Sequence, residues 1–214
     1  KIPLHIHVQD LQPDAAIDLG MIRGNLLKRV LFGLERFSYT VACRVSAIGK
    51  AMIETIEGKG IPKEKLSLFR NWANSEVESL ARLGTNRDWQ RKHPHGDFTV
   101  FYSGNLGEKQ GLETLVEVAL HCQKNRESIK FLIAGDWVKK NEINRQIEQF
   151  RLGNVSLIGV QPLTEYIRLL NLVDVSVVLQ RKEVKDIVVP SKLLNILAAG
   201  CPVIASVHQD SEAA

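Results

Sequence analysis

From about residue 97 onward, short apolar runs alternate regularly with segments of helical periodicity. The run at 173–179 is almost entirely apolar, as expected for a parallel strand that is buried on both faces. Strands that alternate with helices through short turns form a parallel sheet with right-handed crossovers. The pattern therefore predicts an α/β fold, with a Rossmann-like, doubly wound parallel sheet. The expected strands are 97–103, 129–134, 155–158, 173–179 and 202–205, and the expected helices are 112–123, 142–150, 164–170 (with Thr164 as N-cap) and 191–199.

The first half of the chain shows the same alternation of strands and helices, but less regularly. Its expected strands are 4–9, 42–48 and 66–69, and its expected helices are 21–39 and 51–57, which are too few for an independent domain. A polar stretch at 82–96 contains Gly84, Pro94 and Gly96 and is the expected linker. We therefore expect residues 1–90 to be the C-terminal part of one Rossmann-like domain and residues 91–214 to form a second, with further chain beyond both ends.

Composition and charge narrow the class of protein. Apolar residues make up 44% of the chain and charged residues 24%, which is typical of a globular protein with a real core. Residues 1–95 hold 15 Lys and Arg against 10 Asp and Glu, an excess too small for a nucleic-acid partner but suited to an anionic membrane surface or an acidic substrate. The cysteines, Cys43, Cys122 and Cys201, are widely spaced, which favours reduced thiols in a cytosolic protein over disulfides or a zinc site.

A glycine-rich turn at 104–111 joins the first strand of the regular half to its first helix. Glycines in such a turn let backbone N–H groups approach an anion, and the following helix N-terminus favours negative charge. The turn is not a GxGxxG dinucleotide turn, and it lacks the Lys-Ser/Thr pair of a P-loop. An ordinary strand–helix turn, with glycines present for geometry alone, is the alternative interpretation.

A second segment, 190–195, begins a later helix. Ser191 is suited to cap that helix, and Lys192 lies in its first turn, where acidic residues are normally preferred. A lysine there indicates an external anion, although a solvated helix start remains the alternative. Asn195 lies one turn further on the same face, and its amide suits the hydroxyls of a sugar. Two such turns in one α/β unit predict a bound nucleoside diphosphate.

Together the two segments resemble the donor half of a GT-B glycosyltransferase, and specifically the retaining glycosyltransferase family 4. The turn at 104–111 is similar to that family's Gly-Arg/Asn-Leu…Lys-Gly turn, and residues 133–136 to its hydrophobic-Gly-Asp/Glu turn. The most specific match is 190–205, which reads Pro-Ser-Lys…Asn…Ala-Ala-Gly-Cys-Pro-Val-Ile-Ala. Weaker matches at 44–48, 68–72 and 154–160 extend the resemblance over nearly the whole chain, and the subgroup it most resembles is the colanic-acid-type exopolysaccharide glycosyltransferases.

The resemblance implies transfer of a sugar from a nucleoside diphosphate sugar to a glycan or lipid-linked glycan acceptor, with retention, in exopolysaccharide synthesis. It implies no cofactor, no metal and no nucleic-acid partner, and a donor site between the two domains. Lys109 and Lys192 would stabilise the leaving diphosphate, Gln161 would lie near the base, and Asn195 near the ribose. The donor-binding residues that it assigns are Gly104, Asn105, Gly107, Lys109, Gln110, Gly135, Gln161, Glu183, Asp186, Pro190, Ser191, Lys192 and Asn195.

Two departures from the family pattern keep a second function open. Asn105 and Asn195 stand where the family usually has a basic residue and a glutamate. The alternative is therefore a sugar-nucleotide-binding module without catalysis. A further rival, an epimerase or dehydrogenase, would need a GxGxxG turn and a Tyr-x-x-x-Lys pair, and the chain carries neither. We expect residues 1–214 alone to bind nucleotide without turnover, because the first strands of the acceptor domain and the C-terminal helix that crosses back to it are missing from the pattern.

The acceptor side offers fewer signals. His5 and His7 share one face of the first expected strand, but no third ligand accompanies them, so hydrogen-bonded sheet histidines are favoured over a metal pair. Asp10 follows that strand, at the edge where α/β proteins bind ligands, and is the candidate for contact with an acceptor hydroxyl. A turn-capping role for Asp10 before Pro13 is the alternative. Asp14 and Asp18 are expected in a first helical turn or as caps.

The expected helix at 21–39 is both apolar and basic. Arg23, Lys28, Arg29 and Arg36 are interspersed with its apolar stripe. A core-facing helix with a solvated basic face is favoured over a helix that lies on an anionic membrane. The second reading would suit an enzyme at the cytoplasmic face of the inner membrane. The stripe consists of Ile22, Leu26, Leu27, Val30, Leu31, Leu34 and Phe37.

Overall fold

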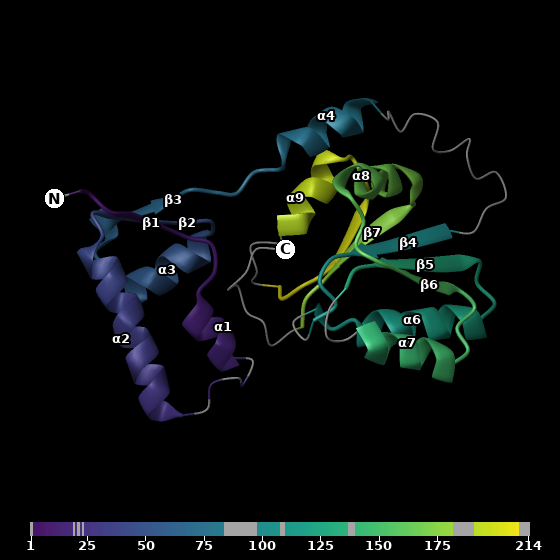
Figure 1. The fold of residues 1–214 in the computed structure, drawn as a ribbon, viewed down its shortest axis with the longest axis horizontal. Coiled ribbons are helices and arrows are strands. Elements are labelled where there is room, and N and C mark those ends of the chain that lie inside the picture. The colour runs from purple at the N-terminus through teal and green to yellow at the C-terminus, as the bar shows by residue number, and fades with distance from the viewer. Residues whose placement is uncertain are drawn as a thin grey trace. The chain divides into compact units, whose positions relative to one another are not determined.

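The computed structural model describes residues 2–18, 20, 22, 24–83, 98–107, 110–136, 140–181 and 191–209. It contains two compact units, one built on residues 2–72 and the other on residues 73–181 and 191–206. Both are α/β units with parallel sheets (Figure 1), which confirms the predicted fold class. The predicted domain boundary between residues 90 and 91 lies outside the described residues.

The first unit is a parallel sheet in the order β1-β2-β3. Its strands are β1 (His5–Val8), β2 (Arg44–Ala47) and β3 (Leu66–Leu68), and its helices are α1 (Gln12–Asp18), α2 (Asn25–Val41) and α3 (Lys50–Gly58), followed by the 3-10 turn η1 (Lys63–Lys65). The core forms where Val45 and Ala47 of the central strand meet Tyr39 of α2 and Met52 and Ile56 of α3.

Lys59, directly after α3, holds the three helices of this unit together. Its ammonium Nζ lies 2.5 Å from Asp14 Oδ2 of α1 and 2.7 Å from Glu35 Oε2 of α2. Tyr39 Oη donates a hydrogen bond to the same Glu35 carboxylate at 3.1 Å, and the Phe32 ring centroid is 5.1 Å from the ammonium. Because Glu35 and Lys59 are mostly shielded from water, breaking this network would leave uncompensated charge. The network therefore fixes which side of α2 faces inward.

The apolar stripe of α2 faces outward, so the predicted core-facing helix is wrong. The helix also starts at Asn25, after Gly24, and not at Met21. Helical periodicity identifies a stripe but does not say what the stripe packs against. Here the inward side is taken by the residues that bond to Lys59. The exposed apolar side chains are Leu26 (77% exposed), Leu27 (51%), Val30 (50%), Leu34 (59%), Phe37 (65%) and Val41 (52%).

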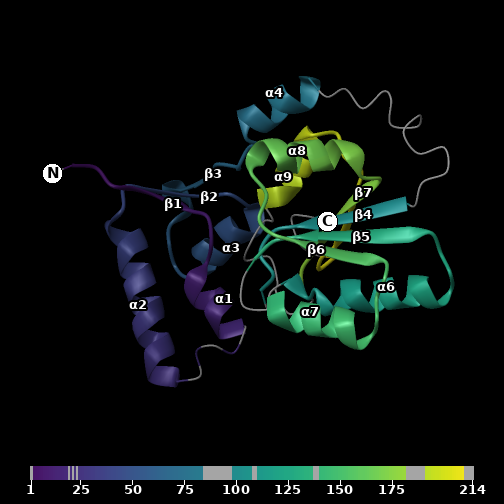
Figure 2. The same cartoon turned by 45° about the vertical axis from the view of Figure 1, so that its right-hand side comes forward.

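The second unit is a five-stranded parallel sheet in the order β6-β5-β4-β7-β8. Its strands are β4 (Phe98–Ser103), β5 (Ile129–Ala134), β6 (Val155–Ile158), β7 (Val175–Leu179) and β8 (Val203–Ser206), and its helices are α4 (Ser75–Leu83), α6 (Glu113–Lys124), α7 (Lys140–Gln149), α8 (Leu163–Leu172) and α9 (Ser191–Ala198). Helices α6 and α7 cover one face of the sheet and α8 and α9 the other (Figure 1, Figure 2), so this unit is doubly wound as predicted.

The strand order creates a topological switch point in the second unit. The chain builds β4, β5 and β6 to one side, then returns to place β7 and β8 on the other side of β4. Open α/β sheets bind ligands beyond the carboxyl ends of the two strands at which the order reverses. Those strands are β4 and β7, so the turn at residue 104 and the residues Gln180 and Arg181 lie at the expected edge.

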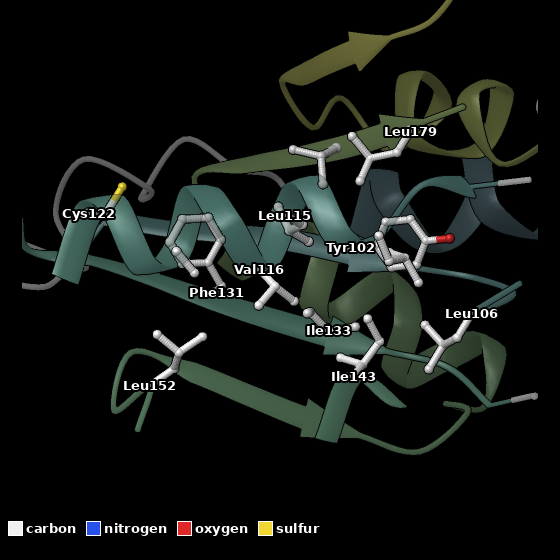
Figure 3. Close-up of a cluster of buried hydrophobic side chains, with 13 residues drawn as sticks. Tyr102, Leu106, Leu115, Val116, Cys122, Phe131, Ile133, Ile143, Leu152 and Leu179 are labelled. Carbon is white, nitrogen blue, oxygen red and sulfur yellow. The ribbon is translucent and has the colours of Figure 1, made fainter. Parts of the chain in front are cut away.

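The core of the second unit includes residues close to the carboxyl ends of these strands. Figure 3 shows Tyr102 of β4, Ile133 of β5 and Leu179 of β7 beside Leu115 and Val116 of α6. Burial of large apolar side chains is the main favourable term in folding, at roughly 1.5–3 kcal/mol for each. The last residues of these strands are therefore held by the core immediately before the chain enters its turns.

Two local features differ from the sequence-based predictions. Helix α4 was not predicted, and it runs into the expected linker at residues 82–83; Asn74 caps it by accepting the Glu76 N–H at 2.9 Å. Thr164 is not an N-cap, because Pro162 precedes α8 and Thr164 already lies in its first turn. None of the helices in the described part of the chain is long and apolar enough to cross a bilayer.

The core predicts a difference between two isoleucines that both lie in strands. Ile133 of β5 is 1% exposed and Ile204 of β8 is 59% exposed. Ile133→Ala should lower the free energy of unfolding by about 2–5 kcal/mol, because it removes buried methyl groups and leaves a cavity. The matched control Ile204→Ala should change it by less than about 0.5 kcal/mol. Urea denaturation of both variants measures this, and equal losses would contradict the assigned core.

Candidate donor-binding site

The glycine-rich turn after β4 is held tightly against the turn after β5. Gly104 N–H donates to the carbonyl of Ala134 at 3.0 Å, and Leu106 N–H donates to the carbonyl of Asp136 at 3.3 Å. A Cβ atom on Gly135 would lie only 2.1 Å from the carbonyl oxygen of Gly104. No side chain fits at that distance, so the two turns can approach each other only because residue 135 is glycine.

These contacts decide which backbone N–H groups of the turn are available to a ligand. The N–H groups of Gly104 and Leu106 already donate to Ala134 and Asp136, whereas those of Asn105 and Gly107 have no acceptor in the described part of the chain. Gly104 has a φ of 142°, a backbone conformation that residues with a side chain rarely adopt. The chain bends sharply at this residue, where the turn begins. Of the N–H groups in this turn, those of Asn105 and Gly107 are therefore the candidates for the predicted contact with an anion.

Lys192 reaches this turn from the first turn of α9. Its Nζ lies 4.1 Å from the centroid of the Tyr102 ring and 3.3 Å from where a Cβ on Gly104 would stand. Tyr102 Oη donates to the carbonyl of Asn105 at 2.7 Å, which ties the ring to the turn. The structure thus brings together the two segments that the sequence singled out.

The ammonium of Lys192 lacks a counter-charge within the described ranges. Burial lowers its pKa from the ordinary value of lysine to about 8, and the first turn of α9 contains no acidic residue. Taking a cation out of water without an anion is costly, and the face of the Tyr102 ring compensates only in part. Lys192 is therefore a half-buried positive charge that an external anion would stabilise.

Two amide side chains beside Gly107 place hydrogen-bond acceptors next to the N–H donors of the turn. A Cβ on Gly107 would lie 2.9 Å from Asn105 Oδ1 and 3.2 Å from Gln110 Oε1. Gln110 Oε1 is buried, and no group among the described residues donates to it. A buried acceptor of this kind needs a donor, which a hydroxyl supplies and a phosphate oxygen does not. The turn thus offers N–H donors to an anion and acceptors to hydroxyl groups.

Arg181 and Tyr102 are not among the assigned donor-binding residues, although the family resemblance implies that the loop 181–189, which Arg181 begins, covers the donor sugar. Arg181 follows β7, and its Nη2 lies 3.0 Å from Glu113 Oε1 in the first turn of α6. A Cβ on Gly111 would lie 3.2 Å from Arg181 Cγ, so the arginine packs against the end of the glycine-rich turn. A charged residue two positions after a nearly all-apolar strand was the available signal for Arg181. Tyr102 gave no signal, because an aromatic residue in a strand is normally core.

The other predicted donor residues lie in different settings. Asn195 Oδ1 accepts the Asn74 N–H at 3.2 Å, so the oxygen expected to meet a ribose holds the start of α4. A carbonyl oxygen has two lone pairs, which leaves room for a second donor. Gln161 follows the edge strand β6 and donates to the carbonyl of Gly159 at 2.8 Å. Ser191 is the first residue of α9. Lys109, Glu183, Asp186 and Pro190 lie outside the described residues.

The predicted acceptor residues belong to the first unit. Asp10 lies just beyond the carboxyl end of β1 and is half-buried. His5 Nε2 and His7 Nδ1 each lie 2.9 Å from Ser46 Oγ, which agrees with hydrogen-bonded sheet histidines. A hydroxyl has one hydrogen, so at least one of the imidazoles donates to it. Across the described ranges, no group of three or more His, Cys, Asp or Glu side chains is placed to hold a metal ion.

A doubly wound unit with a half-buried lysine at its switch point, preceded in the chain by another parallel α/β unit, fits the architecture of a GT-B glycosyltransferase. Residues 85–211 match the family model described as glycosyl transferases group 1. The chain belongs to this family of glycosyltransferases.

Individual relatives agree with this assignment. The putative colanic acid biosynthesis glycosyl transferase WcaI of Escherichia coli (strain K12) is 30% identical over 207 residues, which cover 91% of this chain and 49% of that protein. The probable glycosyltransferase WbjE of Pseudomonas aeruginosa is 26% identical, with 96% and 51% covered. Among solved structures, Anabaena HepE in complex with UDP-glucose superposes with a TM-score of 0.66 at 18% identity, with 95% and 53% covered. The chain thus spans about half the length of the curated relatives it matches.

The close approach of the two turns predicts a strong effect of a single methyl group. Gly135→Ala would place Cβ against the Gly104 carbonyl, so the turns must separate, and we expect a loss of at least about 1–3 kcal/mol in the free energy of unfolding. The matched control is Gly159→Ala after β6, where nothing lies within 4 Å of an added Cβ; it should change stability by less than about 0.5 kcal/mol. Thermal or urea unfolding compares the two, and a silent Gly135→Ala would disprove the contact.

Proposed function

We propose that the protein carrying this chain transfers a sugar from a nucleoside diphosphate sugar to a glycan or lipid-linked glycan, with retention of anomeric configuration. The observation that carries this proposal is Lys192, a half-buried cation beside the Gly104 turn, at the switch point and without a carboxylate partner among the described residues. Two relatives support it: HepE was solved with UDP-glucose bound, and WcaI is named for colanic acid biosynthesis. We place the reaction in the cytoplasm, at the inner face of the membrane, in surface polysaccharide synthesis.

The proposed chemistry follows from charge development on the leaving group. When the bond between the sugar and the diphosphate breaks, negative charge grows on the diphosphate oxygens. A cation and N–H donors fixed in advance stabilise this charge more than they stabilise the intact donor, which lowers the barrier. In this proposal Lys192 and the N–H groups of Asn105 and Gly107 supply that stabilisation, and Lys109 contributes a second cation. The Gln110 carbonyl accepts from a hydroxyl of the donor and thereby orients it.

A second candidate function is nucleotide-sugar binding without catalysis. Asn105 and Asn195 are neutral at positions where the family usually carries charge, and Asn195 is engaged with Asn74 in this structure. Binding alone needs only the anion site, whereas catalysis also needs groups that act on the sugar. Glu183 and Asp186 are the proposed groups near the sugar. Turnover by the full-length protein separates the two candidates.

One substitution at the anion site should weaken ligand binding without lowering the stability of the ligand-free protein. Lys192→Met should weaken binding of the preferred nucleoside diphosphate by about tenfold or more, because a charge-assisted contact is lost. The same change should not destabilise the ligand-free protein, since it removes a buried charge without a carboxylate partner. Calorimetric titration of UDP, GDP and ADP against this chain measures affinity and names the base. The matched control is Lys124→Met, an exposed lysine in the last turn of α6.

The pH dependence gives this variant a second readout. Because the ligand-free pKa of Lys192 is about 8 and a bound diphosphate would raise it, binding takes up a proton above that pH. Affinity should be level near pH 7 and fall by up to about tenfold per unit above pH 8. Lys192→Met should flatten the decline. Equal affinity of the native chain and the variant would remove Lys192 from the site.

Turnover and stereochemistry test the transferase itself. The full-length protein, supplied with the nucleotide sugar of the base identified above and with glycan or lipid-linked acceptors, should form a product that keeps the anomeric configuration of the donor, as NMR reports. Lys192→Met should lower kcat/KM by about 10²-fold or more, because it removes transition-state stabilisation. Residues 1–214 alone should bind nucleotide without transfer. An inverted product would refute retention, and binding with no transfer to any acceptor would favour the binding module.

A further inference from the structure

Three ring side chains gather at the carboxyl end of the sheet in the first unit. The ring centroids of His7 and Phe69 lie 5.4 Å apart, and those of Phe69 and Trp72 lie 5.7 Å apart. Both pairs are nearly perpendicular, with interplanar angles of 85° and 84°. His7 belongs to β1 and Phe69 directly follows β3, so their rings meet across the central strand β2. We call His7, Phe69 and Trp72 the aromatic cluster.

The strands hold this cluster in place. Phe69 N–H donates to the carbonyl of Ala47 at 2.9 Å, which extends the pairing of β2 and β3 by one residue. His7 Nδ1 lies 2.9 Å from Ser46 Oγ, and Ser46 is 1% exposed. The edge-to-face contact then positions the Trp72 ring against Phe69. A surface that is ordered before it binds loses less freedom on binding, which favours a ligand.

Two rings of the cluster are nevertheless open to water. Trp72 is 72% exposed and Phe69 is 53% exposed. In an edge-to-face pair each ring covers at most one face of the other, so Phe69 leaves at least one face of Trp72 uncovered. Single exposed apolar side chains are normal, whereas adjacent exposed aromatic rings at the carboxyl edge of a parallel sheet, where α/β proteins bind ligands, mark a binding surface.

The sheet face that carries the cluster is polar. Side chains of a strand alternate between the two faces of the sheet. Ile6, Val8 and Val45 belong to the core that α2 and α3 cover (Figure 1). His7 and its partner Ser46 therefore lie on the opposite face. Because strands that are covered by protein on both faces are apolar nearly throughout, this face suits a hydroxylated ligand better than a covering layer of apolar side chains.

A pyranose ring has both properties that this surface requires. Its C–H hydrogens form an apolar patch with a slight positive charge, which the negative face of an aromatic ring attracts. Its hydroxyl groups need hydrogen-bond partners around the ring. Asp10 lies at the same carboxyl edge, beyond β1, and a carboxylate accepts hydrogen bonds from hydroxyls. A nucleobase would also stack on Trp72, but the N–H donors and the lysine suited to the diphosphate of a nucleotide belong to the second unit.

We propose that Trp72 and Phe69 form a stacking platform for a pyranose ring of the glycan acceptor. Trp72 presents the stacking face, Phe69 holds the Trp72 ring, and Asp10 accepts from a hydroxyl of the sugar. The assignment of this sugar to the acceptor rests on the proposed transferase function, whereas the saccharide site itself does not. The two aromatic residues bind the sugar and take no part in the transfer chemistry.

The first test is saturation-transfer NMR with the full-length protein and three probes, the methyl β-D-pyranosides of glucose, galactose and N-acetylglucosamine. At least one probe should receive magnetisation, mainly on the C–H hydrogens of one ring face. Trp72→Ala should lower this signal about fivefold or more, and Trp72→Phe should retain most of it, because phenylalanine restores an aromatic face. The matched control Phe150→Ala removes an aromatic side chain of the second unit that is 40% exposed, and it should leave the signal unchanged.

Kinetics of the full-length protein connect the platform to the acceptor. With the glycan that the transfer assay accepts, Trp72→Ala should raise the acceptor KM about tenfold or more and change kcat less than about twofold, because it removes a contact that substrate and transition state share. Trp72→Phe should recover most of the loss in KM. The affinity for UDP, GDP or ADP should stay at the native value in both variants.

The outcomes separate this inference from the proposed transferase. A probe signal that depends on Trp72, with no turnover, would refute the transferase and leave the saccharide site standing. Four results would overturn the platform: no magnetisation on any of the three probes, an acceptor KM that Trp72→Ala leaves unchanged, weaker nucleotide binding by Trp72→Ala, or unfolding by the same change. The third would show that a base stacks on Trp72, and the fourth that the aromatic cluster serves the fold alone.

Discussion

The second unit depends on one backbone contact, the approach of Gly135 to the carbonyl of Gly104. A Cβ at 135 would lie 2.1 Å from that oxygen, so the contact exists only because residue 135 is a glycine. It allows the carbonyls of Ala134 and Asp136 to accept the N–H groups of Gly104 and Leu106, whereas those of Asn105 and Gly107 have no acceptor in the described part of the chain. The tight turn also leaves space for the Lys192 ammonium above Tyr102, because a side chain at 104 would stand 3.3 Å from it. The lack of a side chain at Gly104 and Gly135 therefore determines which backbone N–H groups lack an acceptor and leaves room for the Lys192 ammonium at the switch point.

The sequence predicted most where local and global preferences agree. Strands β5 and β6 have the predicted limits, since each is an apolar run between polar turns. The order of strands could not be read directly, but alternation of strand and helix leaves few topologies once crossovers must be right-handed. The pairing of the turn at 104 with the helix at 191 was predictable for the same reason. Parallel strands end at one edge, so the turns that follow β4 and the helix that follows β7 must meet there.

What the sequence did not predict depends on contacts between distant residues. Periodicity revealed the apolar stripe of α2, yet the side that it faces is set by Lys59, which lies far along the chain. Helix α4 begins directly after Asn74, whose side chain caps the helix and whose backbone N–H donates to Asn195. No window of sequence contains both partners of such a contact, so propensity alone misses the element. Thr164 was placed as an N-cap by residue type, but Pro162 already fixes an extended residue before the helix.

Two lysines, one in each unit, illustrate how structure separates a structural charge from a functional one. Lys59 has two carboxylates, at 2.5 and 2.7 Å, and an aromatic ring, so its charge is balanced within the fold. Among the described residues, Lys192 has only the ring, at 4.1 Å, and burial lowers its pKa. A protein that needed Lys192 for stability alone would gain from a carboxylate beside it, and the first turn of α9 is a favourable place for one. Its absence there costs stability, and an anionic ligand restores the balance only while it is bound. Stability and function therefore make opposite demands on this residue, as they do at sites prepared for a charged substrate.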